Sequence, residues 1–319
     1  MKLATVDDGT PDGALAVISA DGSRYLATNV PTLQAAIEGW HKAEPTLTGL
    51  AARLDAGEGE STHSLVFAAP LPRAWQWLDG SAYRSHGALM ETLFGTEPPP
   101  PGRPLMYQGL SHQFLSATSD VPLPREEDGI DFEGEFGIIT DFVPMGVTPE
   151  QALGHIKLLV QINDWSLRAL APVEMKTGFG WIHAKPACSL APFAVTPDEL
   201  GDAWRDGRVH LPLTVDWNGV RFGNAEGGPM EFGFHELVAH AASTRSLCAG
   251  TIIGSGTVSN SNFREIGSAC IAERRGIEML DEGKARTGFM RFGDRVRMEC
   301  RLRDGRVLFG AIDQKVVKA

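Results

Sequence analysis

Residues 129–141 read GIDFEGEFGIITD and place two glutamates, Glu133 and Glu135, among large apolar side chains. An extended strand points the side chains at i and i+2 the same way, so both carboxylates should project from one face of a mostly buried strand. Adjacent anions there repel each other and are costly to desolvate unless a cation or a shared proton compensates them. The alternative is a solvent-facing glutamate pair on an edge strand, because alternation also predicts an outward polar face.

A third carboxylate, Asp164, lies downstream in the apolar run LLVQINDWSLRAL. Mg²⁺, Mn²⁺ and Ca²⁺ are hard ions that prefer carboxylate oxygens. One divalent cation would therefore compensate Glu133, Glu135 and Asp164 together. The sequence predicts a metal site built on these three residues.

The composition is that of a soluble globular protein, with 319 residues of which 43% are hydrophobic and 22% are charged. This length suits one large domain, or a large domain and a small one. The formal net charge is −11, and no large cluster of Lys and Arg stands out. These charges argue against a nucleic-acid partner.

The four cysteines are widely spaced and form neither a CxxC pair nor a zinc-type pattern with histidine. Isolated thiols of this kind are typical of a reducing compartment. The N-terminal MKLATVDDG lacks a hydrophobic signal core, and the sequence contains no run of about 18 apolar residues. We therefore expect a cytoplasmic protein without a membrane partner.

The N-terminal part of the chain reads as a small α+β unit. Short strand-like pieces separated by turn sequences come first, and two segments with helical periodicity follow. Apolar residues and prolines then crowd together, so we place a domain boundary near residue 70. This division gives a small domain over residues 1–70 and a larger domain over residues 71–319.

The larger part mixes helices with a majority of strands. Helices are predicted over residues 81–94 and 234–247, and the prolines of residues 96–104 predict an irregular loop. The dipeptide Asn218-Gly219 is a strong hairpin signal between two strands. Because no βαβ rhythm or internal repeat is visible, we expect a strand-rich α+β fold.

Polar residues suited to a pocket gather in the Gly-, Ser- and Thr-rich segment that contains Tyr107, His112 and Gln113. A lone histidine in a loop is nevertheless more often a surface residue than a catalyst. Lys185 follows the glycine-rich stretch KTGFGWIHA, although lysine in a turn is usually solvated.

The stretch AGTIIGSGTVSN, residues 249–260, offers hydroxyl groups such as that of Thr257, and its glycines permit close backbone approach to a ligand. Neither GxGxxG nor GxxxxGK[ST] occurs in the sequence, so a nucleotide site is not favoured.

Five motifs taken in order resemble the fumarylacetoacetate hydrolase family: IDFEGEFGIIT, NDWSLR, KPA, IGSGTVSN and GDRVRME. The resemblance covers the chain from about residue 65 to the end, and the N-terminal part is similar to the small leading domain of bacterial homogentisate-pathway members. It implies a mixed β-sandwich roll, assembled as a homodimer, that acts on acylpyruvates and related β-dicarbonyl acids with Mg²⁺, Mn²⁺ or Ca²⁺.

The resemblance also implies roles for individual residues. It makes Glu133, Glu135 and Asp164 metal ligands, and it makes Lys185 a charged group beside the metal and the substrate. Thr257 would contact the substrate carboxylate or enolate. Arg168 would support the carboxylates. We also expect Arg168 and Tyr107, the latter from the polar segment described above, to contact the bound substrate.

The chain departs from the family pattern at three positions. Gln113 stands where an aspartate ligand is expected, although its amide could still offer a carbonyl oxygen to the metal. The positions of a catalytic histidine and its glutamate partner are taken by Asp120 and Ile271. His112, next to Gln113, is a replacement base in this interpretation, and water activated at the metal is an equal alternative.

These features together predict a metal-dependent hydrolase that cleaves a carbon–carbon bond of a fumarylacetoacetate-like acylpyruvate or β-diketo acid. Lys185, Thr257 and His112 would be its catalytic residues, with Mg²⁺ or Mn²⁺ as cofactor. Two alternatives remain at this stage. One is a decarboxylase, tautomerase or isomerase acting on a 2-oxo acid with the same metal, and the other is a non-catalytic relative.

Overall fold

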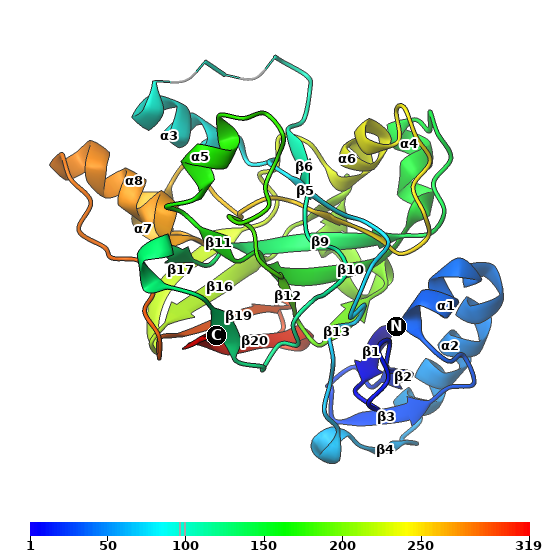
Figure 1. Ribbon diagram of the computed structural model, residues 1–319. Helices are drawn as coiled ribbons and strands as arrows, with labels where there is room; N and C mark the ends of the chain where they lie inside the picture. Colours follow the sequence, from blue (N-terminus) through cyan, green and yellow to red (C-terminus); the bar gives the residue numbers. More distant parts are fainter. Residues whose placement is uncertain (96, 99) are drawn as a thin grey trace.

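The computed structural model describes residues 1–95, 97–98 and 100–319 and is built around one large mixed sheet (Figure 1). Within this described part, the sheet has 11 strands in the order β4-β3-β2-β1-β13-β10-β9-β18-β5-β6, with β12 paired to β10. Its neighbouring strands run antiparallel, except for the parallel pair β18 and β5. The strands are β1 Lys2–Val6, β2 Ala14–Ile18, β3 Arg24–Ala27, β4 Glu60–Ser61, β5 Trp77–Gly80, β6 Met106–Gln108, β9 Gly134–Thr140, β10 Ile156–Asn163, β12 Ser189–Leu190, β13 Phe193–Val195 and β18 Thr251–Gly254.

A second sheet has the order β17-β16-β19-β20-β7. The predicted hairpin between β16 and β17 is confirmed, and its turn residues Asn218 and Gly219 both have positive φ, 50° and 78°. Two short strand pairs, β8 with β11 and β14 with β15, complete the described strands. The bounds are β7 Val121–Leu123, β8 Ile130–Asp131, β11 Ser166–Leu167, β14 Trp204–Arg205, β15 Arg208–Val209, β16 Pro212–Trp217, β17 Val220–Glu226, β19 Arg295–Arg301 and β20 Val307–Lys318.

The helices lie around these sheets (Figure 1). The helix predicted over residues 234–247 ends earlier, at Ala241, because the backbone of Leu247 pairs with that of Val143 instead. Of the predicted loop over residues 96–104, residues 96 and 99 lie outside the described residues. The α-helices are α1 Leu33–Glu38, α2 Trp40–Asp55, α3 Arg84–Phe94, α4 Pro149–Ala152, α5 Ala171–Met175, α6 Phe234–Ala241, α7 Phe263–Ile266 and α8 Ile271–Glu282, and the 3₁₀ helices are η1 Thr62–Ser64, η2 Glu126–Asp128, η3 Leu153–His155 and η4 Pro197–Ala203.

Strand β9 is buried on both faces, which explains its nearly continuous apolar sequence. Phe136 and Ile138 pack in the core shared with β16 and β19 of the second sheet, whereas Ile139 packs with the core that includes Leu33 and Leu47 of the N-terminal helices. The two cores therefore sandwich the strand that carries Glu135. The architecture is the strand-rich α+β fold expected from the sequence.

The N-terminal strands belong to the large sheet, since β1 pairs with β2 on one side and with β13 on the other. The small unit predicted over residues 1–70 thus shares its sheet with the rest of the chain. The placement of the domain boundary near residue 70 remains a prediction. Among the described residues, no helix has the length and apolar character needed to cross a membrane.

Candidate active site

Four buried carboxylates meet in the middle of the large sheet. Asp79, Glu133, Glu135 and Asp164 each offer one oxygen, and these oxygens all lie within 4.8 Å of one another. Asp79 stands on β5 and Glu135 on β9, while Glu133 immediately precedes β9 and Asp164 immediately follows β10. The structure therefore brings together the three carboxylates selected from the sequence and adds Asp79, which the sequence analysis missed.

The meeting of β5 and β9 depends on the strand between them. Gly254 of β18 lies opposite Asp79 of β5 in register. A Cβ atom at Gly254 would lie 2.6 Å from Oδ1 of Asp79 and 2.8 Å from Oε2 of Glu135. The backbone N–H of Gly256 also donates to Oδ1 of Asp79 at 3.2 Å. The glycines of the IGSGT stretch thus leave room for two carboxylates and orient one of them.

Two cationic side chains contact the carboxylates. Nζ of Lys185 donates to Oδ2 of Asp164 at 2.5 Å and to Oε2 of Glu133 at 2.9 Å. Arg168 forms an ion pair with Glu133 and donates through Nε to Oδ2 of the buried Asp131 at 2.8 Å. Both cations bond to Glu133, while neither forms an ion pair with Asp79 or Glu135 within the described residues.

Glu135 carries the least compensated charge of the group. Its side chain is fully buried, and both of its carboxylate oxygens lack a hydrogen-bond partner among the residues that the structure describes. Burial and the neighbouring charges of Asp79, Asp164 and Glu133 raise the pKa of Glu135 well above its ordinary value. An unpartnered carboxylate among others is the arrangement that a hard divalent cation stabilises, so these donors fit Mg²⁺ or Mn²⁺.

The pKa values of the other charged side chains shift in different directions, depending on whether a cation or an anion lies beside them. Burial, followed by the charge of Asp164, raises the pKa of Asp79 to about 8. Burial would also raise the pKa of Glu133, but Arg168 and Lys185 outweigh it and lower that pKa below its ordinary value. For Lys185, the negative charges of Asp164 and Glu133 overcome the effect of burial and raise the pKa, so its ammonium group stays charged.

Two further side chains fix Asp164. The hydroxyl of Tyr107, on β6, donates to Oδ2 of Asp164 at 2.6 Å, and the Cys188 thiol donates to Oδ1 at 2.9 Å. Nζ of Lys185 lies 5.4 Å from the centre of the Tyr107 ring. Thr257 is 6% exposed and directly follows Gly256. Tyr107 therefore contacts the carboxylate group, and Thr257 lies beside the backbone that orients Asp79.

A histidine–glutamate pair, formed by the partly buried His86 and the buried Glu273, lies near the same group and was also missed by the sequence analysis. Nδ1 of His86, on α3, is 3.6 Å from Oε1 of Glu273, on α8. The Ser259 hydroxyl donates to the same glutamate oxygen, and Ser85 donates to Ser259 at 2.8 Å. His86 is also among the groups that lower the pKa of Glu133, although burial, Arg168 and Lys185 have larger effects. His86 therefore lies near the carboxylates.

Two family models match the chain, each over a different part. The family model described as "Fumarylacetoacetate (FAA) hydrolase C-terminal" matches residues 76–317, and "Fumarylacetoacetase N-terminal domain 2" matches residues 1–73. The chain belongs to the fumarylacetoacetate hydrolase family. The family includes hydrolases that are related to this chain by sequence.

One such relative is the 2,4-didehydro-3-deoxy-L-rhamnonate hydrolase of Sphingomonas sp. (strain SKA58), which is 27% identical over 162 residues. This match covers 50% of the chain and 54% of the relative, so the chain spans about half the length of the curated relatives it matches.

Solved structures of family members share the fold of this chain. The maleylpyruvate hydrolase from Sphingobium sp. SYK-6, crystallised with manganese(II) and pyruvate, is 17% identical, with a TM-score of 0.67 and 100% of both chains covered. The 5-carboxymethyl-2-hydroxymuconate delta-isomerase from Mycobacterium smegmatis is also 17% identical, with a TM-score of 0.65, 100% of this chain covered and 99% of that chain. At these identities the likeness establishes the fold alone.

Two residues expected at the fumarylacetoacetate hydrolase site have exposed side chains in the structure. The side chains of His112 and Gln113 are exposed in the loop before Phe114. Within the described residues, neither forms a hydrogen bond or ion pair with the four carboxylates. Asp79 supplies the fourth carboxylate from a different strand, β5. The sequence held no spacing signal for it, because Asp79 lies 54 residues before Glu133.

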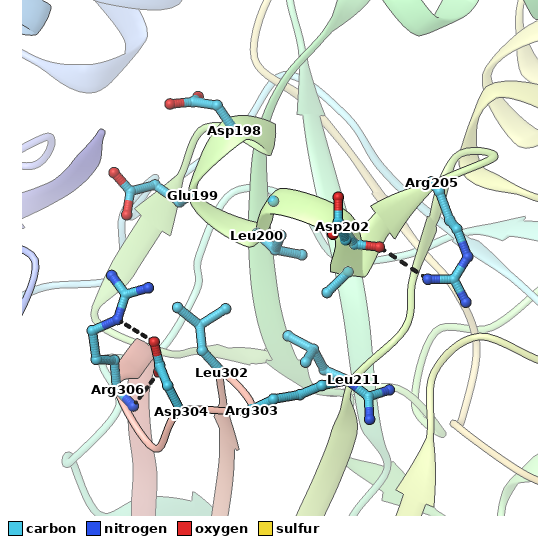
Figure 2. A pocket seen from close by; sticks show the side chains of 12 residues that line it. Asp198, Glu199, Leu200, Asp202, Arg205, Leu211, Leu302, Arg303, Asp304 and Arg306 are labelled. Atoms are coloured by element: carbon cyan, nitrogen blue, oxygen red, sulfur yellow. Dashed lines mark hydrogen bonds and ion pairs between the residues drawn. The ribbon is translucent and has the colours of Figure 1, made fainter.

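A separate hollow opens between η4 and the turn that joins β19 to β20, with a volume of about 640 Å³ (Figure 2). Arg306 forms an ion pair with Asp304 at 2.7 Å, and Arg205 donates to the backbone carbonyl of Asp202 at 2.9 Å. None of the four carboxylates lines this hollow. Because the charged side chains of this hollow, such as Asp202, Arg205 and Asp304, are exposed whereas the four carboxylates are buried, the carboxylate group is the stronger candidate for chemistry.

Proposed function

We propose that this protein is a metal-dependent hydrolase that cleaves an acylpyruvate or a related β-diketo acid into pyruvate and a carboxylic acid. The observation that carries the proposal is the buried group of four carboxylates in which both oxygens of Glu135 lack a hydrogen-bond partner within the described part of the chain. The related maleylpyruvate hydrolase, whose structure contains manganese(II) and pyruvate, supports this choice.

Asp79, Glu133, Glu135 and Asp164 would hold the ion. A bound Mg²⁺ or Mn²⁺ supplies Lewis-acid stabilisation of the negative charge that develops as the carbon–carbon bond breaks. Lys185 remains charged beside Asp164 and Glu133, so it acts as a fixed cation toward the substrate carboxylate or enolate. The Thr257 hydroxyl orients the same substrate oxygens.

His86 is the general base in this proposal, in place of His112. Its Nδ1 faces the buried Glu273, which stabilises the protonated imidazole. His86 removes a proton from water, and the oxygen of that water attacks the acyl carbonyl. The bond to the methylene carbon then breaks, the electron pair passes to the pyruvate enolate, and proton return to that carbon completes the reaction.

Turnover measured with a carboxylate variant tests this proposal. Purified protein with Mg²⁺ or Mn²⁺ should release pyruvate from acetylpyruvate. Glu135→Gln should lower kcat by at least about 10³-fold, because the site loses a ligand charge without a change in side-chain shape. Glu44→Gln, on the exposed face of α2, is the matched control and should keep full activity. Retained turnover in Glu135→Gln would contradict the proposal.

A second candidate keeps the metal but drops the hydrolytic water. The similarity of the fold to a delta-isomerase supports an isomerase, tautomerase or decarboxylase that acts on a 2-oxo acid. Mass spectrometry distinguishes the candidates, because hydrolysis yields two fragments, isomerisation leaves the mass unchanged and decarboxylation releases CO₂. A non-catalytic relative would give no product, and calorimetry would detect negligible binding of Mg²⁺ or Mn²⁺.

The resemblance to the family also supports a homodimer with a small dicarbonyl acid as its ligand. Sedimentation of the purified protein tests the oligomeric state. A concentration-independent monomer would contradict this part of the proposal.

A further inference from the structure

An exposed apolar segment borders the carboxylate group. Within residues 173–182, here called the rim segment, Val173 is 67% exposed, Met175 65%, Phe179 98% and Ile182 76%. Single exposed apolar residues are normal on protein surfaces. Several large exposed apolar residues within one short segment instead mark a site where an apolar ligand or surface binds.

The base of the rim segment is held firmly. The carboxylate of Glu174 accepts hydrogen bonds from the backbone N–H groups of Ile182 at 3.1 Å, His183 at 2.8 Å and Ala184 at 3.0 Å. The side chain of Glu174 thus joins the end of α5 to the backbone just before Lys185. The apolar side chains are therefore exposed on a segment whose base is held in place by hydrogen bonds.

The tip of the rim segment leaves Phe179 free to contact a ligand. Gly178 and Gly180 flank this side chain with φ of 70° and 99°, values that glycine adopts without steric cost. A Cβ at either glycine would meet nothing within 4 Å, so the tip has open space around it.

The rim segment is continuous with the active site. The Trp181 ring packs edge-on against the ring of Tyr107, with 6.0 Å between their centres. The hydroxyl of that same Tyr107 donates to Asp164, and Lys185 follows the segment by three residues. A substrate whose 2-oxo acid end lies at the carboxylate group would extend its other end along Tyr107 and Trp181 toward Phe179.

We propose that the rim segment binds the acyl end of the substrate, and that the preferred substrates carry an apolar acyl chain rather than a polyhydroxylated one. This inference rests on the proposed function. Hydroxyl groups would lose hydrogen bonds with water against Phe179 and Ile182, whereas a hydrocarbon chain would bury apolar surface there. The rim segment also contains one basic residue, Lys176. Because its ammonium group could pair with an anion, the main alternative is a substrate whose acyl end carries a second carboxylate.

Two chelating ligands that differ only in their tails test this inference without turnover. Oxamate presents a 2-oxo acid head, and N-hexyloxamate adds a hydrocarbon tail. Calorimetry of the Mg²⁺-loaded protein should give at least tenfold tighter binding for N-hexyloxamate. Phe179→Ser should reduce that ratio at least threefold, while Val220→Ser, which also replaces an exposed apolar side chain by serine, at a 70% exposed position on β17, should leave the ratio unchanged.

The outcomes separate the inference from the proposed function. Failure of both ligands to bind would overturn the proposed function and this inference with it. Equal binding of the two ligands, or tighter binding of N-(5-carboxypentyl)oxamate than of N-hexyloxamate, would overturn the inference alone. If Phe179→Ser instead dissociates a dimer in sedimentation and leaves the ligand ratio unchanged, a second copy of the chain covers the segment and the inference is also wrong.

Discussion

At the scale of single residues, the site depends on a glycine as much as on its charged side chains. Gly254 lies where a methyl group would meet Asp79, Glu135 and, at 2.4 Å, the ring of Trp77. Its position in the IGSGT motif is therefore explained by the packing of two carboxylates.

Gly254→Ala should weaken Mg²⁺ or Mn²⁺ binding by at least about tenfold and destabilise the protein by about 1–3 kcal/mol, because the added methyl overpacks the site. Calorimetry and urea denaturation measure the two effects. Gly49→Ala in α2 is the control, because its Cβ meets nothing within 4 Å and should stabilise the helix by about 0.5–1 kcal/mol. Wild-type metal affinity in Gly254→Ala would contradict this account.

The raised pKa of Asp79 predicts a pH dependence of the metal-free protein. The unfolded carboxyl loses its proton near its ordinary pKa of 3.8, whereas the folded one keeps it until about pH 8. Between these values the native state binds more protons, so the free energy of unfolding should fall as pH rises, and Asp79 contributes at most about 1.4 kcal/mol per pH unit to that slope.

Urea denaturation of chelator-treated protein at pH 5, 6, 7 and 8 measures this slope. Asp79→Asn cannot lose a proton, so its slope should be shallower than that of the wild type. If the free energies of unfolding of the wild type and of Asp79→Asn changed with pH in parallel, Asp79 would not have a raised pKa.

At the scale of elements, Asp131 joins a helix to the metal site. It accepts from the backbone N–H groups of Ile271 at 2.7 Å and Ala272 at 2.9 Å, at the start of α8, and it also bonds to Arg168. Arg168 contacts the proposed metal ligand Glu133, and α8 carries Glu273, the partner of the proposed base. The buried carboxylate of Asp131 therefore helps to position both residues.

Asp131→Asn should destabilise the protein by about 2–4 kcal/mol, because it leaves the partly buried Arg168 with a single anionic partner and removes the buried charge that the start of α8 bonds to. Activity should fall as well, since both Glu133 and α8 lose an anchor. Asp281→Asn, which breaks an exposed ion pair between α8 and Arg264, should cost less than about 1 kcal/mol. Thermal denaturation and kcat of the two variants provide the comparison, and equal losses would argue against a special role for Asp131.

At the scale of the whole molecule, the four carboxylates come from segments that are far apart in sequence. A cation held by them would connect β5 and β9 with the residues that precede β9 and follow β10. Metal binding should therefore stabilise the fold, by about 2.7 kcal/mol at a metal concentration of 100 Kd.

The difference in Tm between protein with Mn²⁺ and protein with a chelator measures this stabilisation. The Tm of the wild type should rise with Mn²⁺, while Glu135→Gln should show little change. A wild-type Tm that does not respond to Mn²⁺ or Mg²⁺ would contradict the metal assignment.

The local sequence was sufficient for several features. The spacing of Glu133 and Glu135 among the apolar residues of 129–141 predicted a mostly buried strand with two carboxylates on one face, and Asn218-Gly219 predicted its hairpin, because side-chain spacing and turn conformation are set by neighbouring residues. The motif order indicated the family and its strand-rich α+β fold. The apolar run around Asp164 marked that carboxylate as a candidate, and the resemblance to the family marked Lys185.

Only the tertiary structure added Asp79 to the carboxylates, paired His86 with Glu273 and left His112 and Gln113 exposed. It also ended the helix of residues 234–247 early. Each of these outcomes depends on which strands and helices become neighbours, as when the parallel pairing of β18 with β5 brings Asp79 beside Glu135. Such pairings join residues widely separated along the chain, so no local spacing can reveal them.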